Sequence, residues 1–129
     1  MARFYKTHLG FKLERDYRVD AKMMNDIFRI PSRCRIVFLT KDNFSIEFFY
    51  FLDARIKKAD ARRLGYNHWT MMVKDKDQFC VRLKKKGIRV IQIPKPHGFT
   101  YFLEDPEKNL IEIKSHELKN SRAARLRKY

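Results

Sequence analysis

The spacing of apolar side chains predicts three short helices, each bounded by residues that start or stop a helix. The helices are expected over residues 2–9, 20–30 and 75–86. Gly10, Pro31 and Gly87 follow them, and both glycine and proline end helices. Asp20 and Asp75 stand at the start of the second and third helices, where a carboxylate can accept hydrogen bonds from free backbone amides.

Seven other segments are predicted to be strands, and in two of them, residues 11–19 and 67–74, the side chains alternate as in a strand with one buried face. The strands are expected over residues 11–19, 35–40, 44–52, 67–74, 88–93, 99–103 and 110–114. In the first strand, Lys12, Glu14 and Asp16 are expected to face solvent. Turn-forming residues join later strands at 41–43, 94–98 and 105–108. Residues 94–98 are expected to be a connecting loop, with a mobile lid as the alternative.

The order of these elements repeats along the chain. Residues 66–115 are expected to form strand, helix, strand, strand, strand, and residues 1–52 follow the same order without the opening strand. His68, on the opening strand of the second half, precedes Gly87 by 19 residues. The same count back from Gly10 leads to a position about ten residues upstream of this chain.

The repeat predicts one domain built from two modules. Its expected parts are module one at 1–52, a linker at 53–65, module two at 66–115, a domain end at 118 and a basic tail at 119–129. Because the first module lacks an opening strand, its sheet has an exposed edge that another chain would cover. A homodimer is therefore expected.

Composition narrows the class of protein. Hydrophobic residues make up 44% of the 129 residues, enough for a real core. No apolar run is long enough to span a bilayer, and the first residues lack the apolar stretch of a signal peptide. A soluble, cytoplasmic protein is expected. Cys34 and Cys80 are too few and too far apart for a disulfide framework, and both are expected to be buried thiols.

Thirty basic and fifteen acidic side chains give a formal net charge of +15, which attracts polyanions at low salt. The charge is spread along the chain, with concentrations at Lys84–Lys86 and in the tail. Neither concentration interleaves basic residues with exposed aromatic ones, the pattern of single-strand binding platforms. A nucleic-acid partner is therefore not favoured, and no nucleic-acid-binding residues are predicted.

Glu47 and Glu112 each place one carboxylate within an otherwise apolar strand. An ionised group is costly to bury unless something binds it. His68 lies on a third strand, and one imidazole with two carboxylates suits zinc, nickel, manganese or iron. The alternative is that a nearby arginine or lysine satisfies each glutamate and that His68 is a hydrogen-bonded core residue.

The second half, from Gly65 to Ile113, resembles the vicinal oxygen chelate superfamily, which includes glyoxalase I, bleomycin-resistance proteins, methylmalonyl-CoA epimerase and extradiol dioxygenases. The strongest match is the Asp105-Pro106 turn that leads into Asn109-Leu110-Ile111-Glu112. In the first half, Phe4-Tyr5 and Leu9-Gly10-Phe11 resemble the first helix of the family and its following turn. The resemblance implies an α+β fold in which two βαβββ modules form an open barrel of mixed sheet.

This sequence departs from the family pattern in two places. The family usually has glycine where Lys108 stands, so Lys108 is expected to adopt a backbone conformation that glycine reaches more easily. The first metal-binding histidine of the glyoxalase-like members lies on the opening strand that module one lacks. The fold is expected to tolerate both departures, and the second bears on activity.

The resemblance implies a metal-dependent isomerase, lyase or dioxygenase that acts on a small oxygen-rich metabolite. The divalent metal would stabilise an enediolate-like oxyanion, with His68, Glu112 and Glu47 as ligands. Glu112 is the better candidate for the catalytic base, and Glu47 is the second. Pocket candidates are Thr70, Met72, Phe49 and Tyr101, and for Tyr101 a core role is preferred.

Two other functions remain open. The first is a metal-free protein of the bleomycin-resistance type, which would hold a ligand between aromatic walls. The second is a basic protein that binds polyanions, which rests on charge alone. The sequence does not identify the substrate or the metal.

Overall fold

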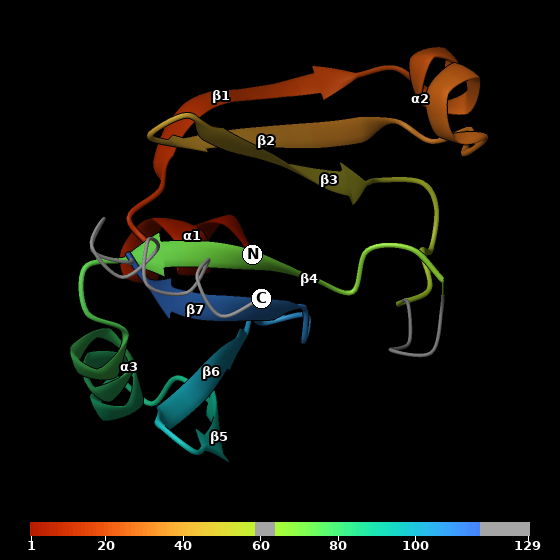
Figure 1. The fold of residues 1–129 in the computed structure, drawn as a ribbon. Coiled ribbons are helices and arrows are strands. Elements are labelled where there is room, and N and C mark those ends of the chain that lie inside the picture. The colour runs from red at the N-terminus through yellow and green to blue at the C-terminus, as the bar shows by residue number, and fades with distance from the viewer. Residues whose placement is uncertain (59–63, 117–129) are drawn as a thin grey trace, which may run out of the picture. The chain divides into compact units, whose positions relative to one another are not determined.

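The computed structural model describes residues 1–58 and 64–116. The chain forms two compact units, Met1–Arg63 and Leu64–Tyr129, and each is described by itself (Figure 1). The predicted tail at 119–129 and part of the predicted linker lie outside the described residues. Among the described residues, no helix combines the length and the apolar character needed to span a bilayer.

The first unit contains two helices and an antiparallel sheet. Its elements are α1 (Ala2–His8), β1 (Lys12–Val19), α2 (Ala21–Phe28), β2 (Cys34–Lys41) and β3 (Phe44–Phe51), with strand order β1-β2-β3. Asp20 caps α2 as predicted, because its carboxylate accepts a 2.8 Å hydrogen bond from the Met23 amide. Lys41 pairs with Phe44, so the predicted turn at 41–43 narrows to two residues.

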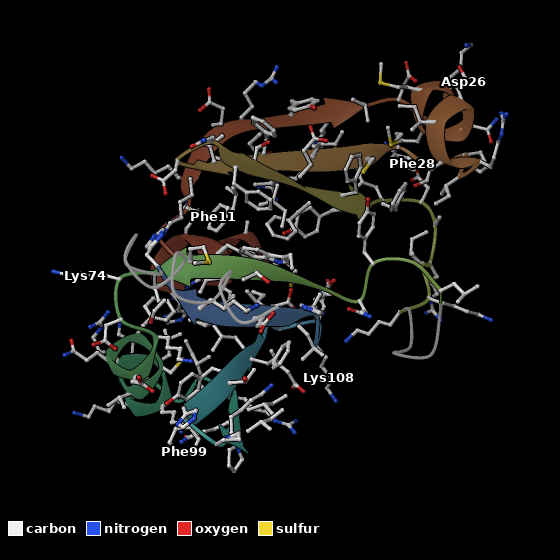
Figure 2. The ribbon with its side chains drawn as sticks, in the orientation of Figure 1. Phe11, Asp26, Phe28, Lys74, Phe99 and Lys108 are labelled. Atoms are coloured by element: carbon white, nitrogen blue, oxygen red, sulfur yellow. The ribbon has the colours of Figure 1, made fainter. Side chains whose placement is uncertain are left out.

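The two faces of the first sheet are covered by different helices. On one face, the Tyr5 ring of α1 lies 4.9 Å from the ring of Phe48, measured between centroids. On the other face, the ring of Phe28 of α2, which Figure 2 labels, lies 5.2 Å from that of Phe49. Residues of this second face form a core with Met24 of α2, namely Tyr17, Val19, Cys34, Ile36, Phe49 and Phe51. Even positions of β2 and odd positions of β3 therefore face α2.

A β-bulge interrupts the regular alternation in β1. Leu13 pairs with Leu39 and Arg15 pairs with Phe38, so that Glu14 is an extra residue. Lys12, Glu14 and Asp16 are all exposed, as predicted. The bulge nevertheless puts Lys12 and Asp16 on opposite faces of the sheet, because their partners Thr40 and Val37 lie on opposite faces of β2. Leu13 is also exposed, although a regular alternation would bury it.

The second unit contains one helix on a four-stranded mixed sheet (Figure 1). Its elements are β4 (His68–Val73), α3 (Lys76–Lys85), β5 (Val90–Lys95), β6 (Gly98–Glu104) and β7 (Leu110–Ser115). The strand order is β4-β7-β6-β5, in which β4 and β7 are parallel and the other pairs are antiparallel. This is the predicted strand, helix, strand, strand, strand order, and the predicted α+β class is confirmed.

The core of the second unit lies between α3 and one face of its sheet. Its buried side chains are Met71, Cys80, Leu83, Tyr101, Leu103, Ile111 and Ile113. The predicted cap of α3 is confirmed, because the Asp75 carboxylate accepts a hydrogen bond from the Gln78 amide. Cys34 and Cys80 are buried free thiols, as predicted. Burial raises the pKa of the Cys80 thiol to about 11, so it stays protonated at neutral pH.

Two turns shape the second sheet. Lys95 pairs with Gly98, so the predicted loop at 94–98 is a tight two-residue hairpin turn. At the start of β7, Asp105 accepts hydrogen bonds from the backbone amides of Glu107 and Asn109 and from the Asn109 side chain. Lys108 has φ of 65°, the left-handed conformation that was expected there.

Candidate functional site

Three neighbouring strands of the second sheet place candidate residues on one face. Thr70 on β4 and Phe102 on β6 both pair with Glu112 on β7. The neighbours of Glu112 along β7, Ile111 and Ile113, are buried on the face that packs against α3. Because side chains alternate along a strand, Glu112 lies on the face opposite α3. In Figure 2, Lys108 marks the start of β7.

His68 and Glu112 face each other across the pair β4 and β7. Nε2 of His68 lies 3.5 Å from Oε2 of Glu112. Nδ1 of His68 lies 2.5 Å from Oδ1 of Asn67, and this amide oxygen can only accept. With Nδ1 donating to Asn67, Nε2 is the ring nitrogen that lies against the carboxylate. A cation shared by Nε2 and Oε2, either a proton or a metal ion, would stabilise this arrangement.

The surroundings of Glu112 combine burial with polar contacts. Its side chain is 14% exposed. Thr70 Oγ1 donates a 3.2 Å hydrogen bond to Oε2, and Lys114 Nζ lies 3.5 Å from Oε1. The Phe102 ring packs edge-on against His68, with centroids 5.3 Å apart. The carboxylate thus has a lysine partner, as the simpler interpretation expected, and also the histidine that the metal-site interpretation requires.

The His68–Glu112 pair suits a divalent metal ion. Metal-bound histidines commonly donate their second ring N–H to an oxygen acceptor, as His68 does to Asn67. Donor atoms 3.5 Å apart can both reach one ion through bonds of about 2.1 Å. Within residues 1–58 and 64–116, no group of three or more His, Cys, Asp and Glu side chains gathers at one point. The described residues thus bring together two of the three residues that the sequence predicted as ligands, His68 and Glu112.

Tyr101 does not share the face of Glu112. It pairs with Ile113, is buried beside α3, and donates a 2.5 Å hydrogen bond to Oδ1 of Asp77 on that helix. This hydrogen bond, together with burial, raises the pKa of Tyr101 to about 12. The pocket assignment for Tyr101 is corrected to the core role that was preferred. The pairing of β6 with β7 places Phe102, and not Tyr101, beside Glu112. This pairing could not be predicted from the sequence of one strand alone.

Thr70 and Met72 lie on the His68 side of β4, and Met72 is exposed. Their neighbours Trp69, Met71 and Val73 are more buried, as the alternation predicted. Phe102 was missed by sequence reasoning, although its alternation with buried Leu103 placed it on the opposite face. It forms one wall of the site against His68.

Glu47 lies in the first unit, on β3. It pairs with Phe38 and shares a strand face with Phe49, which packs against Phe28. Glu47 is exposed and makes no ion pair with the described residues of its unit. The alternative in which an arginine or lysine satisfies Glu47 therefore receives no support from residues 1–58. Its assignment as a metal ligand stays a prediction.

The family model of the Glyoxalase/Bleomycin resistance protein/Dioxygenase superfamily matches residues 1–113. The chain belongs to this superfamily. The resemblance inferred from the Asp105-Pro106 turn and the Glu112 strand is thereby confirmed. No curated protein matches the chain significantly.

Solved structures of the superfamily share this fold. The trypanothione-dependent glyoxalase I of Leishmania major is 20% identical, with a TM-score of 0.65 over 97% of this chain and 81% of that one. A glyoxalase family protein of Bacillus cereus is 20% identical, with a TM-score of 0.66 over 85% and 80%. A glyoxylase/bleomycin resistance protein/dioxygenase domain from Frankia is 18% identical, with a TM-score of 0.67 over 92% and 82%. At these identities the likeness establishes the fold.

Proposed function

We propose that this superfamily member is a metal-dependent isomerase, lyase or dioxygenase that acts on a small oxygen-rich metabolite. The single observation that carries the proposal is the approach of His68 Nε2 to within 3.5 Å of Glu112 Oε2. The contact between Nδ1 and Asn67 leaves Nε2 as the ring nitrogen that faces the carboxylate. The candidate metals are zinc, nickel, manganese and iron, and a role for Glu47 as a further ligand stays a prediction from the sequence.

Four residues around His68 in the second unit have roles in this proposal. Asn67 orients the His68 ring through its contact with Nδ1. Glu112 is the proposed ligand and the proposed base, which would take a proton from the substrate. Thr70 orients Oε2 through its hydrogen bond, while the Lys114 ammonium group lies 3.5 Å from Oε1. A divalent ion, when bound, supplies Lewis-acid stabilisation of an enediolate-like oxyanion.

The experiment is a zinc titration by calorimetry of protein purified without a tag. We expect one divalent ion per chain, and about a hundredfold lower affinity in His68→Ala and Glu112→Ala. His97→Ala is the matched histidine control, because His97 is exposed in the turn between β5 and β6. Glu107→Gln is the carboxylate control in the exposed Asp105 turn. Absence of zinc binding by the wild type, or equal losses in the controls, would contradict the proposal.

The second candidate is a metal-free ligand-binding protein of the bleomycin-resistance type. The ion pair between Lys114 and Glu112 favours it, because an ammonium group 3.5 Å from Oε1 partly neutralises the carboxylate without metal. In this case His68→Ala would leave ligand affinity nearly unchanged. Calorimetry with and without a chelator separates the two functions.

We also propose that the chain acts as a homodimer. In the described part of the first unit, β3 pairs with β2 on one side and has no strand on its other side. A strand edge of this kind is commonly covered by another chain. Light scattering at micromolar concentration tests the assembly, and a monomeric mass would contradict it.

A further inference from the structure

Each strand-borne glutamate belongs to a row of three residues that crosses its sheet. In the second unit the row is Glu112, Phe102 and Ile91, each paired with the next. In the first unit the row is Glu47, Phe38 and Arg15. The rows match in their glutamate and phenylalanine and differ at the third position. An apolar residue satisfies the fold at that position in the second unit, so the guanidinium of Arg15 is not required by the fold.

The Arg15 guanidinium is positioned by aromatic rings. Its central carbon lies 5.3 Å from the centroid of Phe38 and 5.7 Å from that of Tyr17. Such cation–π contacts restrict the side chain and leave its N–H groups available. Arg15 forms no ion pair with the described residues, whereas Arg33 and Arg35 of the same unit are each paired with an aspartate. Arg15 is therefore an ordered cation without a carboxylate partner in residues 1–58 or 64–116.

The bulge at Glu14 brings a second cation to the same face. Lys12 pairs with Thr40 and Arg15 pairs with Phe38, and both partners lie on the α2-facing side of β2. Residues three apart on a regular strand lie on opposite faces of the sheet. Lys12 and Arg15 lie on the same face because the bulge adds Glu14 between them. Beside Lys12 is an open hollow of about 340 Å³, lined by Gly10, Lys12, Thr40, Lys41 and Asp42, and Arg15 lies outside its lining. Lys41 Nζ is occupied by a hydrogen bond to the Leu9 carbonyl.

We propose that Lys12 and Arg15 form a subsite for the carboxylate or phosphate group of a small anionic substrate. Phe38 lies between this subsite and Glu47, because it pairs with Arg15 on one side and with Glu47 on the other. Strands lie about 4.8 Å apart, so Arg15 and Glu47 on the two outer strands are separated by roughly 10 Å of backbone. A ligand of metabolite size spans that distance. The role in catalysis rests on the function proposed above, whereas anion binding does not.

The test is a nuclear magnetic resonance titration of the ¹⁵N-labelled full chain with inorganic phosphate and, separately, with acetate. Chloride keeps the ionic strength constant, because diffuse charge attraction depends on salt. The test variant is K12Q/R15Q. The matched control is K6Q/R18Q, which removes the same charge. Lys6 is exposed on α1. Arg18 pairs with Arg35, which lies on the face of β2 that points away from α2 because its neighbours Cys34 and Ile36 face that helix. Arg18 therefore lies on the face of β1 opposite Arg15.

We expect saturable shifts of the amides around Lys12, Arg15 and Phe38, with affinity about tenfold lower in K12Q/R15Q and changed less than about twofold in K6Q/R18Q. Saturation by phosphate alone identifies a phosphoryl group, and saturation by acetate identifies a carboxylate; either result supports the subsite. Equal losses in both variants, or shifts spread over the whole surface, would overturn it. Zinc affinity is measured in parallel and should be unchanged in K12Q/R15Q. Failure of metal binding is thus distinguished from failure of the anion subsite.

Discussion

Replacing Asp105 by alanine should destabilise the second unit by removing the anchor of the turn that presents β7. Within the described part of the chain, the Asp105 side chain accepts hydrogen bonds of 2.9 Å from three donors of its own turn, and the residue is 4% exposed. A single hydrogen bond to a charged group contributes about 1.5–3 kcal/mol, and such contributions are not additive. Because the freed amides partly reach water in an exposed turn, the expected loss is about 3 kcal/mol. That is a large fraction of the ~5–15 kcal/mol that stabilises a typical domain.

Urea denaturation followed by circular dichroism measures this loss. Asp105→Asn keeps one oxygen for the two backbone amides, so we expect it to lose only about 1–1.5 kcal/mol. Glu107→Ala removes an exposed side chain of the same turn and should change stability by less than about 0.5 kcal/mol. A loss below about 1 kcal/mol in Asp105→Ala would refute the reasoning, because the three hydrogen bonds would then contribute little.

Lys108→Gly should raise the free energy of unfolding by about 0.5–1 kcal/mol in the same urea assay, because glycine adopts a φ of 65° without strain; an unchanged midpoint would argue against strain. Tyr101→Phe should lower the free energy of unfolding by about 1 kcal/mol and leave zinc affinity unchanged. The hydrogen bond to Asp77 raises the pKa of Tyr101 to about 12 in the folded protein. Between pH 10 and about 12 the phenol therefore ionises in the unfolded chain but stays protonated in the folded one, and the free energy of unfolding falls. Tyr101→Phe should abolish this fall. Lys114→Met should strengthen zinc binding about fivefold in calorimetry, because its ammonium group competes for Glu112; weaker binding would mean that Lys114 supports the site.

Element types could be predicted where one face of an element is buried and its ends are marked. In β4, greater burial of one strand face gives the alternation of Trp69, Met71 and Val73 with more exposed residues. Asp20 and Asp75 marked the starts of α2 and α3 because capping is local chemistry between neighbours in sequence. The turn at Asp105 is local in the same sense, and even its left-handed residue was foreseen.

Features that depend on pairing between strands could not be predicted. The bulge at Glu14 is defined by the register of β1 against β2, which a single strand does not reveal. For the same reason Tyr101 was considered for the pocket, although its pairing with Ile113 puts it beneath α3. Of the candidate site, His68 and Glu112 were found from residue type and spacing, whereas the contacts of Phe102 and Arg15 required the sheet register.

The parallel pairing of β4 with β7 has a consequence for folding kinetics. His68 and Glu112 are 44 residues apart in sequence, and helix α3 and two strands must be in place before β7 reaches β4. Contacts that close such long loops carry the entropy cost of the whole segment and form late. His68 and Glu112 should therefore come together only when the second unit has folded. The rate at which zinc affinity recovers during refolding would then report the last step of folding and not the first.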